Sequence, residues 1–501
     1  MNAINPRGKV SLVGAGPGGI GLLTLRGKQV IEGADVVLFD RLVNPEILDL
    51  IPSSATRIDV GKSRHNHPVP QNQINALLLR LAEEGKRVVR LKGGDPYLFG
   101  RGAEELEAVI AADIPFEVVP GVTSAIAVPA FAGIPVTHRE FASSMHVITA
   151  HRKDGAIPDL DYQTFVKLKG TLIFLMGVNA IGAITSGLMS AGLAPDTPAA
   201  LIENGARSNQ RALYSTVSEI AAESKVQAFA PPSILVIGGV CSLADRLDWS
   251  RHLPLRGVGV IVTRPRGQDT LSNALRELGA GVTHFPCIRT EPLTVSDSVF
   301  QTLAEQDWIV CTSPTGAAQF FEELTARGMD IRSLHRVKFA AIGEKTAEIF
   351  RRHAVCADYV PTRYNASALA EGLPYSAGAA RVLLFRAQSG TPELITTLET
   401  RGFSVTDVAA YQTHLLTADV ERVRSLLQAG DVRFVTFTSA STVQGFVDAL
   451  PDMDLEAASF QAVCIGEETA AVARRYGFRV LVSEKATIDS MVSCILEQIS
   501  L

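Results

Sequence analysis

The sequence predicts an α/β protein made of several sheets that are covered by helices. Short apolar runs such as VSLVGAG (10–16), RVVRLKGG (87–94) and VGVIVTRP (258–265) have the length and composition of buried strands. Stretches with helical periodicity, such as QINALLLRLAEEGK (73–86), lie between many of them. Apolar strands that alternate with helices are typical of parallel sheets covered on both faces.

Length and charge narrow the class of protein. The 501 residues predict several globular units, at roughly 100–200 residues each. The net charge of −5 and the pI of about 6.1 argue against a general affinity for nucleic acid or an anionic membrane. The start, MNAINPRGKVSLVGAG, lacks the pattern of a secretory signal, and no apolar run approaches the roughly 20 residues of a membrane span. We expect a cytoplasmic protein with no nucleic-acid or membrane partner.

The cysteines predict no metal site. Six occur, and no two form a CxxC pair. Scattered cysteines usually act as small core residues in a reducing compartment.

One domain boundary is predicted near residue 250. The segment CSLADRLDWSRHLPLRG (241–257) follows a strand, is polar, and ends in Pro and Gly before the next strand. We therefore expect a first domain over 1–245, a linker over 246–256 and a second domain over 257–501.

An internal repeat divides the second domain. The string IGE-x-TA opens a predicted helix in FAAIGEKTAEIFRRHAV (339–355) and in QAVCIGEETAAVARRYGFRV (461–480). A strand ending in Thr-Ser precedes each copy, at Thr312-Ser313 and Thr438-Ser439. Two similar units predict two lobes with a cleft between them. Chance similarity between strand–helix units is the alternative.

A glycine-rich loop follows the first strand. Gly14, Gly16 and Gly19 satisfy GxGxxG, which in a Rossmann fold brings backbone close to a dinucleotide pyrophosphate. Pro17 removes an amide from this loop, which makes it a poorer phosphate site. A nicotinamide-dependent oxidoreductase is therefore an alternative that rests on this motif alone.

A longer series of motifs points to another function. VSLVGAGPG, LLTLRG, ADVVLFDRLV, VGK, RVVRLKGGDPYLFGRG, PGVTSA, GIPVTHR, LIFLMG and IENG follow in this order. Residues 8 to 245 thus resemble uroporphyrinogen-III C-methyltransferases of the tetrapyrrole methylase family. The resemblance implies two α/β lobes, S-adenosyl-L-methionine (SAM) in the cleft between them with S-adenosyl-L-homocysteine (SAH) as its product, and a homodimer formed through this half.

The resemblance also implies the residues that bind SAM. They are Pro17, Gly93, Gly94, Asp95, Leu98, Thr123, Ser124, Met176 and Gly205. Paired glycines let backbone pack against a cofactor that must be held in a fixed orientation. Core packing for Met176 and an ordinary turn for Gly205 are the alternatives.

Asp40 and Lys62 match the positions proposed in the family as proton acceptor and proton donor. Methylation of a pyrrole carbon creates an iminium-like cation, so a carboxylate and a proton carrier are reasonable partners. Asp40 can alternatively cap a turn, and Lys62 can be a solvated loop residue.

The substrate implied for this half carries eight carboxylates. Basic residues beside the motifs are candidates to bind them, although each is also compatible with a solvated surface charge. They are Arg41, Arg64, Arg101, His138 and Arg139. The chain departs from the family at Gly19, where GPGD is usual, and the missing carboxylate would help to organise this loop.

The second domain resembles uroporphyrinogen-III synthases. The similar segments are LRGVGVIVTRPRGQ, VCTSPTGAAQFF, FAAIGEKTA, YVPTRYNASAL, VLLFRA, VAAYQTHLL and FTSASTV. The resemblance implies two flavodoxin-like lobes joined by two extended segments, with lobe one over about 257–290 and 416–501 and lobe two over about 291–415. The reaction implied is dehydration and cyclisation of hydroxymethylbilane.

Tyr411 matches the family tyrosine thought to assist departure of hydroxide, and a tyrosine that bridges the lobes is the alternative. Four hydroxyl residues at strand ends are candidates to bind substrate carboxylates, or simply helix caps. They are Thr312, Ser313, Thr438 and Ser439, and Arg264 is the basic candidate.

Together the two resemblances predict one bifunctional enzyme. The second half would supply uroporphyrinogen III from the linear tetrapyrrole, and the first would methylate this cyclic tetrapyrrole at C2 and C7 to precorrin-2. Two alternatives stay open: a second half that binds a tetrapyrrole without converting it, and a methylase that acts on another corrinoid precursor.

Overall fold

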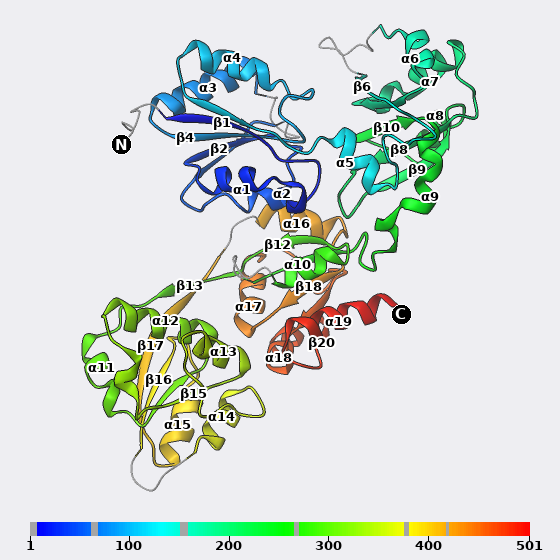
Figure 1. Cartoon of the computed structure of the whole chain (residues 1–501). Helices are drawn as coiled ribbons and strands as arrows, with labels where there is room; N and C mark the ends of the chain where they lie inside the picture. Colours follow the sequence, from blue (N-terminus) through cyan, green and yellow to red (C-terminus); the bar gives the residue numbers. More distant parts are fainter. Residues whose placement is uncertain are drawn as a thin grey trace.

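A computed structural model describes residues 8–61, 69–150, 159–264, 270–374, 380–416 and 420–500. In these residues the strands form four sheets of five strands each. Figure 1 shows four α/β units, two in the N-terminal half and two in the C-terminal half. The predicted α/β class is confirmed.

The first sheet is parallel, in the order β3-β2-β4-β1-β5. Its strands are β1 (Lys9–Gly14), β2 (Val36–Phe39), β3 (Thr56–Asp59), β4 (Arg87–Lys92) and β5 (Phe116–Val119). Successive side chains of a strand point to opposite faces. Leu12 therefore packs with α3 (Gln71–Glu83) and α4 (Gly102–Ala111), and Val13 with α1 (Leu25–Glu32) and α2 (Pro45–Leu48).

The second sheet differs from the prediction of parallel strands. Its order is β6-β7-β10-β8-β9, and only β6 and β7 pair in parallel. The strands are β6 (Met145–Thr149), β7 (Thr171–Leu175), β8 (Pro198–Glu203), β9 (Arg211–Thr216) and β10 (Ser233–Ile237). Helices cover both faces, so β7 and β10 are buried along their whole length whatever their direction.

The helices of this unit include five α-helices, and short 3₁₀ turns occur in and beside it. The α-helices are α5 (Ser124–Phe131), α6 (Tyr162–Leu168), α7 (Ile181–Ser190), α8 (Ile220–Val226) and α9 (Ala244–Leu247). The 3₁₀ turns are η1 (Ile20–Leu22, in the first unit), η2 (Val178–Ala180), η3 (Gly239–Leu243) and η4 (Trp249–His252).

The third sheet is parallel, in the order β12-β11-β18-β19-β20. Its strands are β11 (Gly259–Val262), β12 (Gly281–His284), β18 (Phe434–Phe437), β19 (Gln461–Cys464) and β20 (Arg479–Val482). Helices α16 (Val420–Gln428), α17 (Ala440–Asp448) and α18 (Glu467–Arg475) cover one face, and α10 (Thr270–Glu277) and α19 (Ile488–Ser500) cover the other.

The fourth sheet has the order β13-β17-β16-β14-β15, with β13 antiparallel to β17 and the other pairs parallel. Its strands are β13 (Ile288–Pro292), β14 (Trp308–Cys311), β15 (Lys338–Ala341), β16 (Arg381–Ala387) and β17 (Ser404–Leu415). Its helices are α11 (Asp297–Gln301), η5 (Leu303–Glu305), α12 (Pro314–Ala326), η6 (Ile331–Leu334), α13 (Glu344–Arg352), α14 (Ala366–Gly372) and α15 (Pro392–Thr400).

The C-terminal half has two lobes, as the repeat predicts. We call the unit of the third sheet lobe one and the unit of the fourth sheet lobe two. The chain crosses between them along β13 and the end of β17, which pair with each other (Figure 1). One copy of the repeat lies in each lobe: Ser313 and Ser439 cap α12 and α17, and Gly343 and Gly466 begin α13 and α18.

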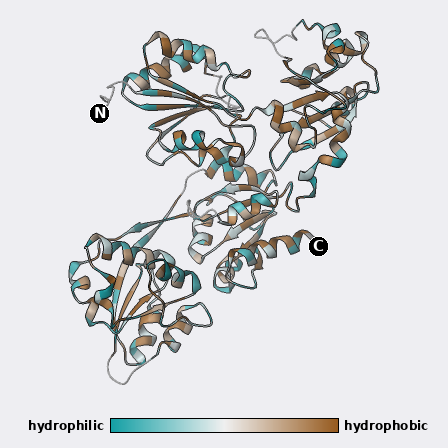
Figure 2. Ribbon diagram, viewed as in Figure 1, coloured by the Kyte–Doolittle hydropathy of each residue, from teal (hydrophilic) through white to brown (hydrophobic). Residues whose placement is uncertain are grey.

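Hydropathy follows this arrangement. Figure 2 shows apolar strands in the middle of each unit, with polar residues on the outer helices. Among the described helices, none is both long enough and apolar enough to cross a membrane.

Candidate functional site

The carboxyl ends of three parallel strands meet in the first unit. Gly14 ends β1, Gly94 follows β4 and Gly121 follows β5. A Cβ atom on Gly14 would lie 2.5 Å from the Gly121 nitrogen, and one on Gly121 would lie 2.2 Å from the Gly94 oxygen. Real Cβ atoms do not approach backbone so closely, so only glycines allow these three strand ends to pack together.

Gly94 also borders open space. Its amide donates to the Gly16 oxygen over 3.0 Å, and the Gly16 amide donates back to the Gly94 oxygen over 3.1 Å. Both residues have positive φ, which favours glycine. A Cβ on Gly94 would meet nothing closer than the Ser124 nitrogen at 3.9 Å. The half-buried backbone of Gly94 thus leaves room for a ligand to approach it.

Asp95 fixes the loop that follows. One carboxylate oxygen accepts from the amides of Tyr97 and Leu98 at 2.9 and 3.1 Å, and the other accepts from the Gly121 amide at 3.1 Å. The side chain therefore organises the loop directly, whatever it contributes to a cofactor. The tip of the loop exposes apolar side chains, with Tyr97 at 55% and Leu98 at 36%.

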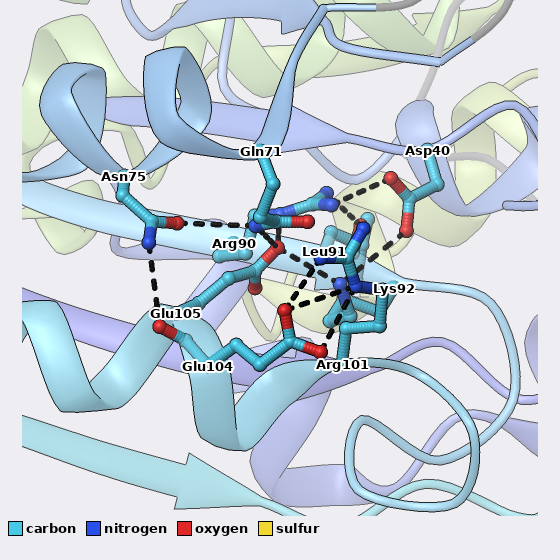
Figure 3. Close-up of polar contacts among 9 residues, drawn as sticks. All are labelled: Asp40, Gln71, Asn75, Arg90, Leu91, Lys92, Arg101, Glu104 and Glu105. Carbon is cyan, nitrogen blue, oxygen red and sulfur yellow. Dashed lines mark hydrogen bonds and ion pairs between the residues drawn. The ribbon is translucent and has the colours of Figure 1, made fainter. Parts of the chain in front are cut away.

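A buried cluster of four charges lies beside this loop (Figure 3). Arg90 in β4 donates to the Asp40 carboxylate over 2.6 Å and to Glu105 over 3.1 Å. Lys92, two residues further along β4, lies 3.0 Å from Glu105 and 3.8 Å from Asp40. The side chains of Arg90, Lys92 and Glu105 are nearly inaccessible, whereas Asp40 is 29% exposed. Asp40 is thus the carboxylate of this cluster that solvent can reach, and Arg90 holds it in place.

The pKa of the Lys92 ammonium group is lowered. Burial lowers the pKa of its ammonium group, as does the neighbouring charge of Arg90, while Glu105 and Asp40 act to raise it. One Glu105 oxygen accepts from Arg90, Lys92 and Gln71, and the other is buried without a partner among the described residues.

Arg101 lies at the start of α4, close to the cluster in Figure 3. Its Nε donates to Glu104 over 3.0 Å, and this hydrogen bond raises the pKa of the guanidinium. Its φ of 58° lies in the left-handed region, which is uncommon for a residue with a side chain. Arg101 is half-exposed and can face a ligand.

The second unit meets the glycine loop from the other side. A Cβ on Gly18 would lie 2.4 Å from the Ala206 oxygen, so Pro17-Gly18 packs against the loop 204–210. Gly205 itself has no room for a side chain because Val128 of α5 lies where its Cβ would be. Met176 is 54% exposed with positive φ, so it does not fill the core.

Other candidates are more scattered. Thr123 caps α5, and Ser124 is its first residue. His138 and Arg139 lie between α5 and β6 in the second unit, where His138 Nδ1 accepts from the Glu140 amide over 3.2 Å. Arg41 is exposed directly after Asp40. Lys62 and Arg64 fall outside the described residues.

In the C-terminal half, Tyr411 is bound to Ser313. Their hydroxyl oxygens are 2.8 Å apart, and Ser313 Oγ also accepts from the Gly316 amide over 2.9 Å. Tyr411 is 8% exposed, and burial raises the pKa of its phenol while the Ser313 hydrogen bond lowers it. This bond ties the end of β17 to the start of α12 within lobe two, so the hydroxyl does not bridge the lobes.

The strand-end hydroxyls of both lobes include helix caps. Ser313 caps α12, and Ser439 forms a capping box with Thr442 at the start of α17. Thr312 and Thr438 precede them and are partly exposed. Capping thus accounts for the two serines, and substrate contact would be an additional role.

Two cations from different lobes lie close enough for their charges to interact. Arg264 lies two residues after the end of β11 in lobe one, and Lys345 lies in the first turn of α13 in lobe two. Burial lowers the pKa of Lys345, and the charge of Arg264 lowers it further. Asp489 of lobe one and Glu348 act in the opposite direction. Arg264 and Lys345 thus bring one positive charge from each lobe to the same region, where the carboxylates of Asp489 and Glu348 also act.

Comparison with known proteins identifies both halves. Residues 9–221 match the family described as Tetrapyrrole (Corrin/Porphyrin) Methylases, and residues 269–493 match Uroporphyrinogen-III synthase HemD. The porphyrin biosynthesis protein HemD of Ruminiclostridium josui is 41% identical, over 98% of each chain. The chain belongs to this family of fused tetrapyrrole methylases and uroporphyrinogen-III synthases. Its halves carry uroporphyrinogen-III C-methyltransferase and uroporphyrinogen-III synthase activities in tetrapyrrole biosynthesis.

Two further proteins are similar to this chain. The uroporphyrinogen-III C-methyltransferase of Bacillus subtilis is 39% identical over 70% of this chain and 72% of its own. A Thermus thermophilus uroporphyrin-III C-methyltransferase, solved with S-adenyl homocysteine, is 39% identical and covers 47% of this chain and 99% of its own, with a TM-score of 0.41.

Sequence reasoning missed four charged residues of these sites. In the methyltransferase half they are Arg90, Lys92 and Glu105, and in the synthase half Lys345. Arg90 and Lys92 carry a usable signal, because two cations two residues apart in a buried strand must share one face. Lys345 is where the repeat differs, since IGEKTA has lysine and IGEETA has Glu468. Nothing in the sequence distinguishes Glu105 from its acidic neighbours.

Proposed function

We propose that the synthase half dehydrates and cyclises hydroxymethylbilane to uroporphyrinogen III, and that the methyltransferase half then methylates this product at C2 and C7 to give precorrin-2. The observation that carries the methylation step is the room at the backbone of Gly94, in the same unit as the partly exposed carboxylate of Asp40. The pairing of the two activities in one chain supports it, because one half makes the substrate of the other.

The glycine-lined strand ends fit SAM as methyl donor. When bound, SAM supplies an electrophilic methyl group and leaves as SAH. Gly93 and Gly94 would face it, Asp95 holds their loop, and Pro17 and Leu98 would contact it from the neighbouring loops. Further SAM contacts would come from the start of α5, at Thr123 and Ser124, and from the second unit, at Met176 and Gly205.

Asp40 would act on the pyrrole that receives the methyl group. Arg90 holds its carboxylate, and a fixed negative charge stabilises the cation that forms on the ring. The carboxylate then accepts the ring proton. Lys62 is proposed as proton donor. Arg41, Arg64, Arg101, His138 and Arg139 would bind substrate carboxylates, since guanidinium groups can contact carboxylates in bidentate fashion.

In the synthase half, Arg264 and Lys345 would bind carboxylates of hydroxymethylbilane from opposite lobes and so hold its ends in reach of each other. Tyr411 would donate a hydrogen bond to the hydroxyl group as it departs as hydroxide, with Ser313 orienting the phenol. Thr312, Thr438 and Ser439 would contribute hydroxyl contacts at the helix starts.

Product analysis tests the two reactions together. Purified protein is given enzymatically generated hydroxymethylbilane under anaerobic conditions, with or without SAM. We expect type-III uroporphyrinogen without SAM and a product two methyl groups heavier with SAM. The type-I isomer alone, which forms by spontaneous closure, would reject the synthase reaction and leave tetrapyrrole binding as the role of that half.

A pair of glycine variants tests the cofactor seat. Gly94→Ala adds a methyl group in open space, so we expect SAH affinity to fall at least about tenfold with a modest cost in stability, on the order of 1–2 kcal/mol from positive φ. Gly121→Ala meets backbone at 2.2 Å, so it should mainly unfold the first unit. Calorimetric titration with SAH and thermal unfolding separate the two effects, and unchanged SAH binding in Gly94→Ala would reject this seat.

Assembly and location complete the proposal. We expect a homodimer formed through the methyltransferase half, a cytoplasmic location, and domain limits at 1–245, 246–256 and 257–501. Light scattering of the intact protein tests the dimer.

A further inference from the structure

The two halves touch at the edge of the proposed SAM cleft. Arg276 of α10 in lobe one donates to Glu46 of α2 over 3.2 Å, and the two side chains are only 21% and 11% exposed. Figure 1 shows lobe one directly below α2. Asn44 caps α2, and its side-chain oxygen accepts a hydrogen bond from the Glu46 amide over 3.0 Å. This cap fixes the position of the Glu46 backbone in the first turn of the helix.

A second contact joins lobe one to the loop 204–210 of the second unit. The Gly257 amide donates to the Ser208 oxygen over 3.1 Å. Gly281 of β12 packs so closely that a Cβ there would lie 2.3 Å from Ser208 Oγ. Ser208 belongs to the loop 204–210, which packs against Gly18. Lobe one therefore contacts α2 and the loop 204–210, which lie against the glycine loop at Gly19 and Gly18 respectively.

The Glu46 carboxylate lies beside the position at which this chain departs from its family. A Cβ on Gly19 would be 3.2 Å from Glu46 Oε2. Gly19 begins the turn η1, and no side chain caps it there. An aspartate side chain at position 19 would therefore lie next to the Glu46 carboxylate of α2.

We propose that Glu46 supplies at this loop the carboxylate that position 19 lacks, and that Arg276 of the synthase half holds it there. The synthase half is then a positioning part of the methyltransferase. This inference rests on the proposed SAM seat. Glu46 and Arg276 act through the loop 16–22 and touch neither SAM nor substrate.

The first test compares two arginines in the intact protein. Removing the partly buried pair with Arg276→Gln should weaken SAH binding about fivefold and raise the KM for SAM similarly, with kcat nearly unchanged. Arg332→Gln, in an exposed pair with Asp330 of lobe two, should change neither. Hydroxymethylbilane cyclisation at the normal rate shows that each variant is folded. Equal SAH affinity in Arg276→Gln and wild type would overturn the proposal.

The second test restores the family residue. Gly19→Asp places a second carboxylate against Glu46, so it should weaken SAH binding because like charges repel. Glu46→Gln alone should behave like Arg276→Gln. In the double variant Gly19→Asp/Glu46→Gln, affinity should return toward wild type, because one carboxylate is again present. Losses that simply add in the double variant would contradict the inference. Unchanged SAH binding in Gly94→Ala would instead reject the seat itself.

Discussion

At the scale of single residues, the methyltransferase half buries an ionic cluster that balances in charge. Arg90 and Lys92 offset Asp40 and Glu105. Charges removed from water are tolerated only when they are paired and hydrogen-bonded. Arg90 donates hydrogen bonds to both carboxylates, whereas Lys92 donates one to Glu105 and lies 3.8 Å from Asp40, so the pairing depends most on Arg90.

Removing Arg90 should therefore cost much more than removing a surface arginine of the same strand. Arg90→Gln leaves two carboxylates poorly compensated, and we expect a loss of about 3–5 kcal/mol in the free energy of unfolding of this half. Arg87→Gln breaks an exposed pair with Asp35 at the start of β4 and should cost about 0–1 kcal/mol. Urea unfolding followed by circular dichroism measures both, and similar losses would contradict the argument.

At the scale of elements, the sequence predicted the strand–helix units and the repeat, because both depend on local patterns. Thr-Ser at the strand ends and IGE-x-TA at the helix starts recur in lobes one and two. The prediction of parallel strands was wrong for the second sheet. A continuous apolar run indicates that a strand is buried on both faces, but it does not indicate whether the strand is parallel or antiparallel to its neighbours.

The candidate site was predictable where it consists of local motifs, as at Gly93-Gly94-Asp95. It was not predictable where distant charges meet. The hydrogen bond between Arg90 and Glu105 depends on the register of α4 against β4. The hydrogen bond between Arg276 and Glu46 depends on how the two halves dock.

A pH-dependent contact holds the edge strand β5. Burial acts to raise the pKa of Glu117, but hydrogen bonds from Lys9, Arg26 and Ser11 lower it to about 2. Because the folded pKa lies below the usual 4.5, the ionised group stabilises the fold above that value, and this stability is lost as pH falls from 4.5 toward 2.

Glu117→Gln should reveal this contribution. At pH 7 we expect it to cost about 1–2 kcal/mol, reduced from the full effect by solvent screening. Near pH 2 the variant and wild type should be nearly equal in stability. Chemical unfolding across this pH range measures the difference, and a gap that does not depend on pH would exclude the mechanism.

At the scale of the whole molecule, the proposed synthase site draws residues from both lobes. Arg264 comes from one and Lys345 from the other, so neither lobe alone presents both charges. The cation at position 345 is where the repeat has diverged, because the matching residue in lobe one is Glu468.

Lys345→Gln should raise the KM for hydroxymethylbilane roughly tenfold, as expected for the loss of a charge-assisted hydrogen bond. Spontaneous closure would then yield a larger share of the type-I isomer. Lys338→Gln, in the same lobe with its ammonium over Trp308, is the matched control and should have little effect. Because the pKa of Lys345 is lowered, the wild-type KM should begin to rise at a lower pH than for an ordinary lysine, and Lys345→Arg should delay that rise. Equal isomer ratios in both glutamine variants would exclude the role.

The ladder between β13 and β17 is the connection along which the chain crosses between the two lobes (Figure 1). Ile288 at one end packs in the core of lobe one, and Tyr411 at the other packs in the core of lobe two. The last pair of the ladder is Pro292 with Tyr411. In the proposed mechanism the hydroxyl donor thus stands where the connection between the lobes enters lobe two, so the strand that joins the lobes also carries the phenol.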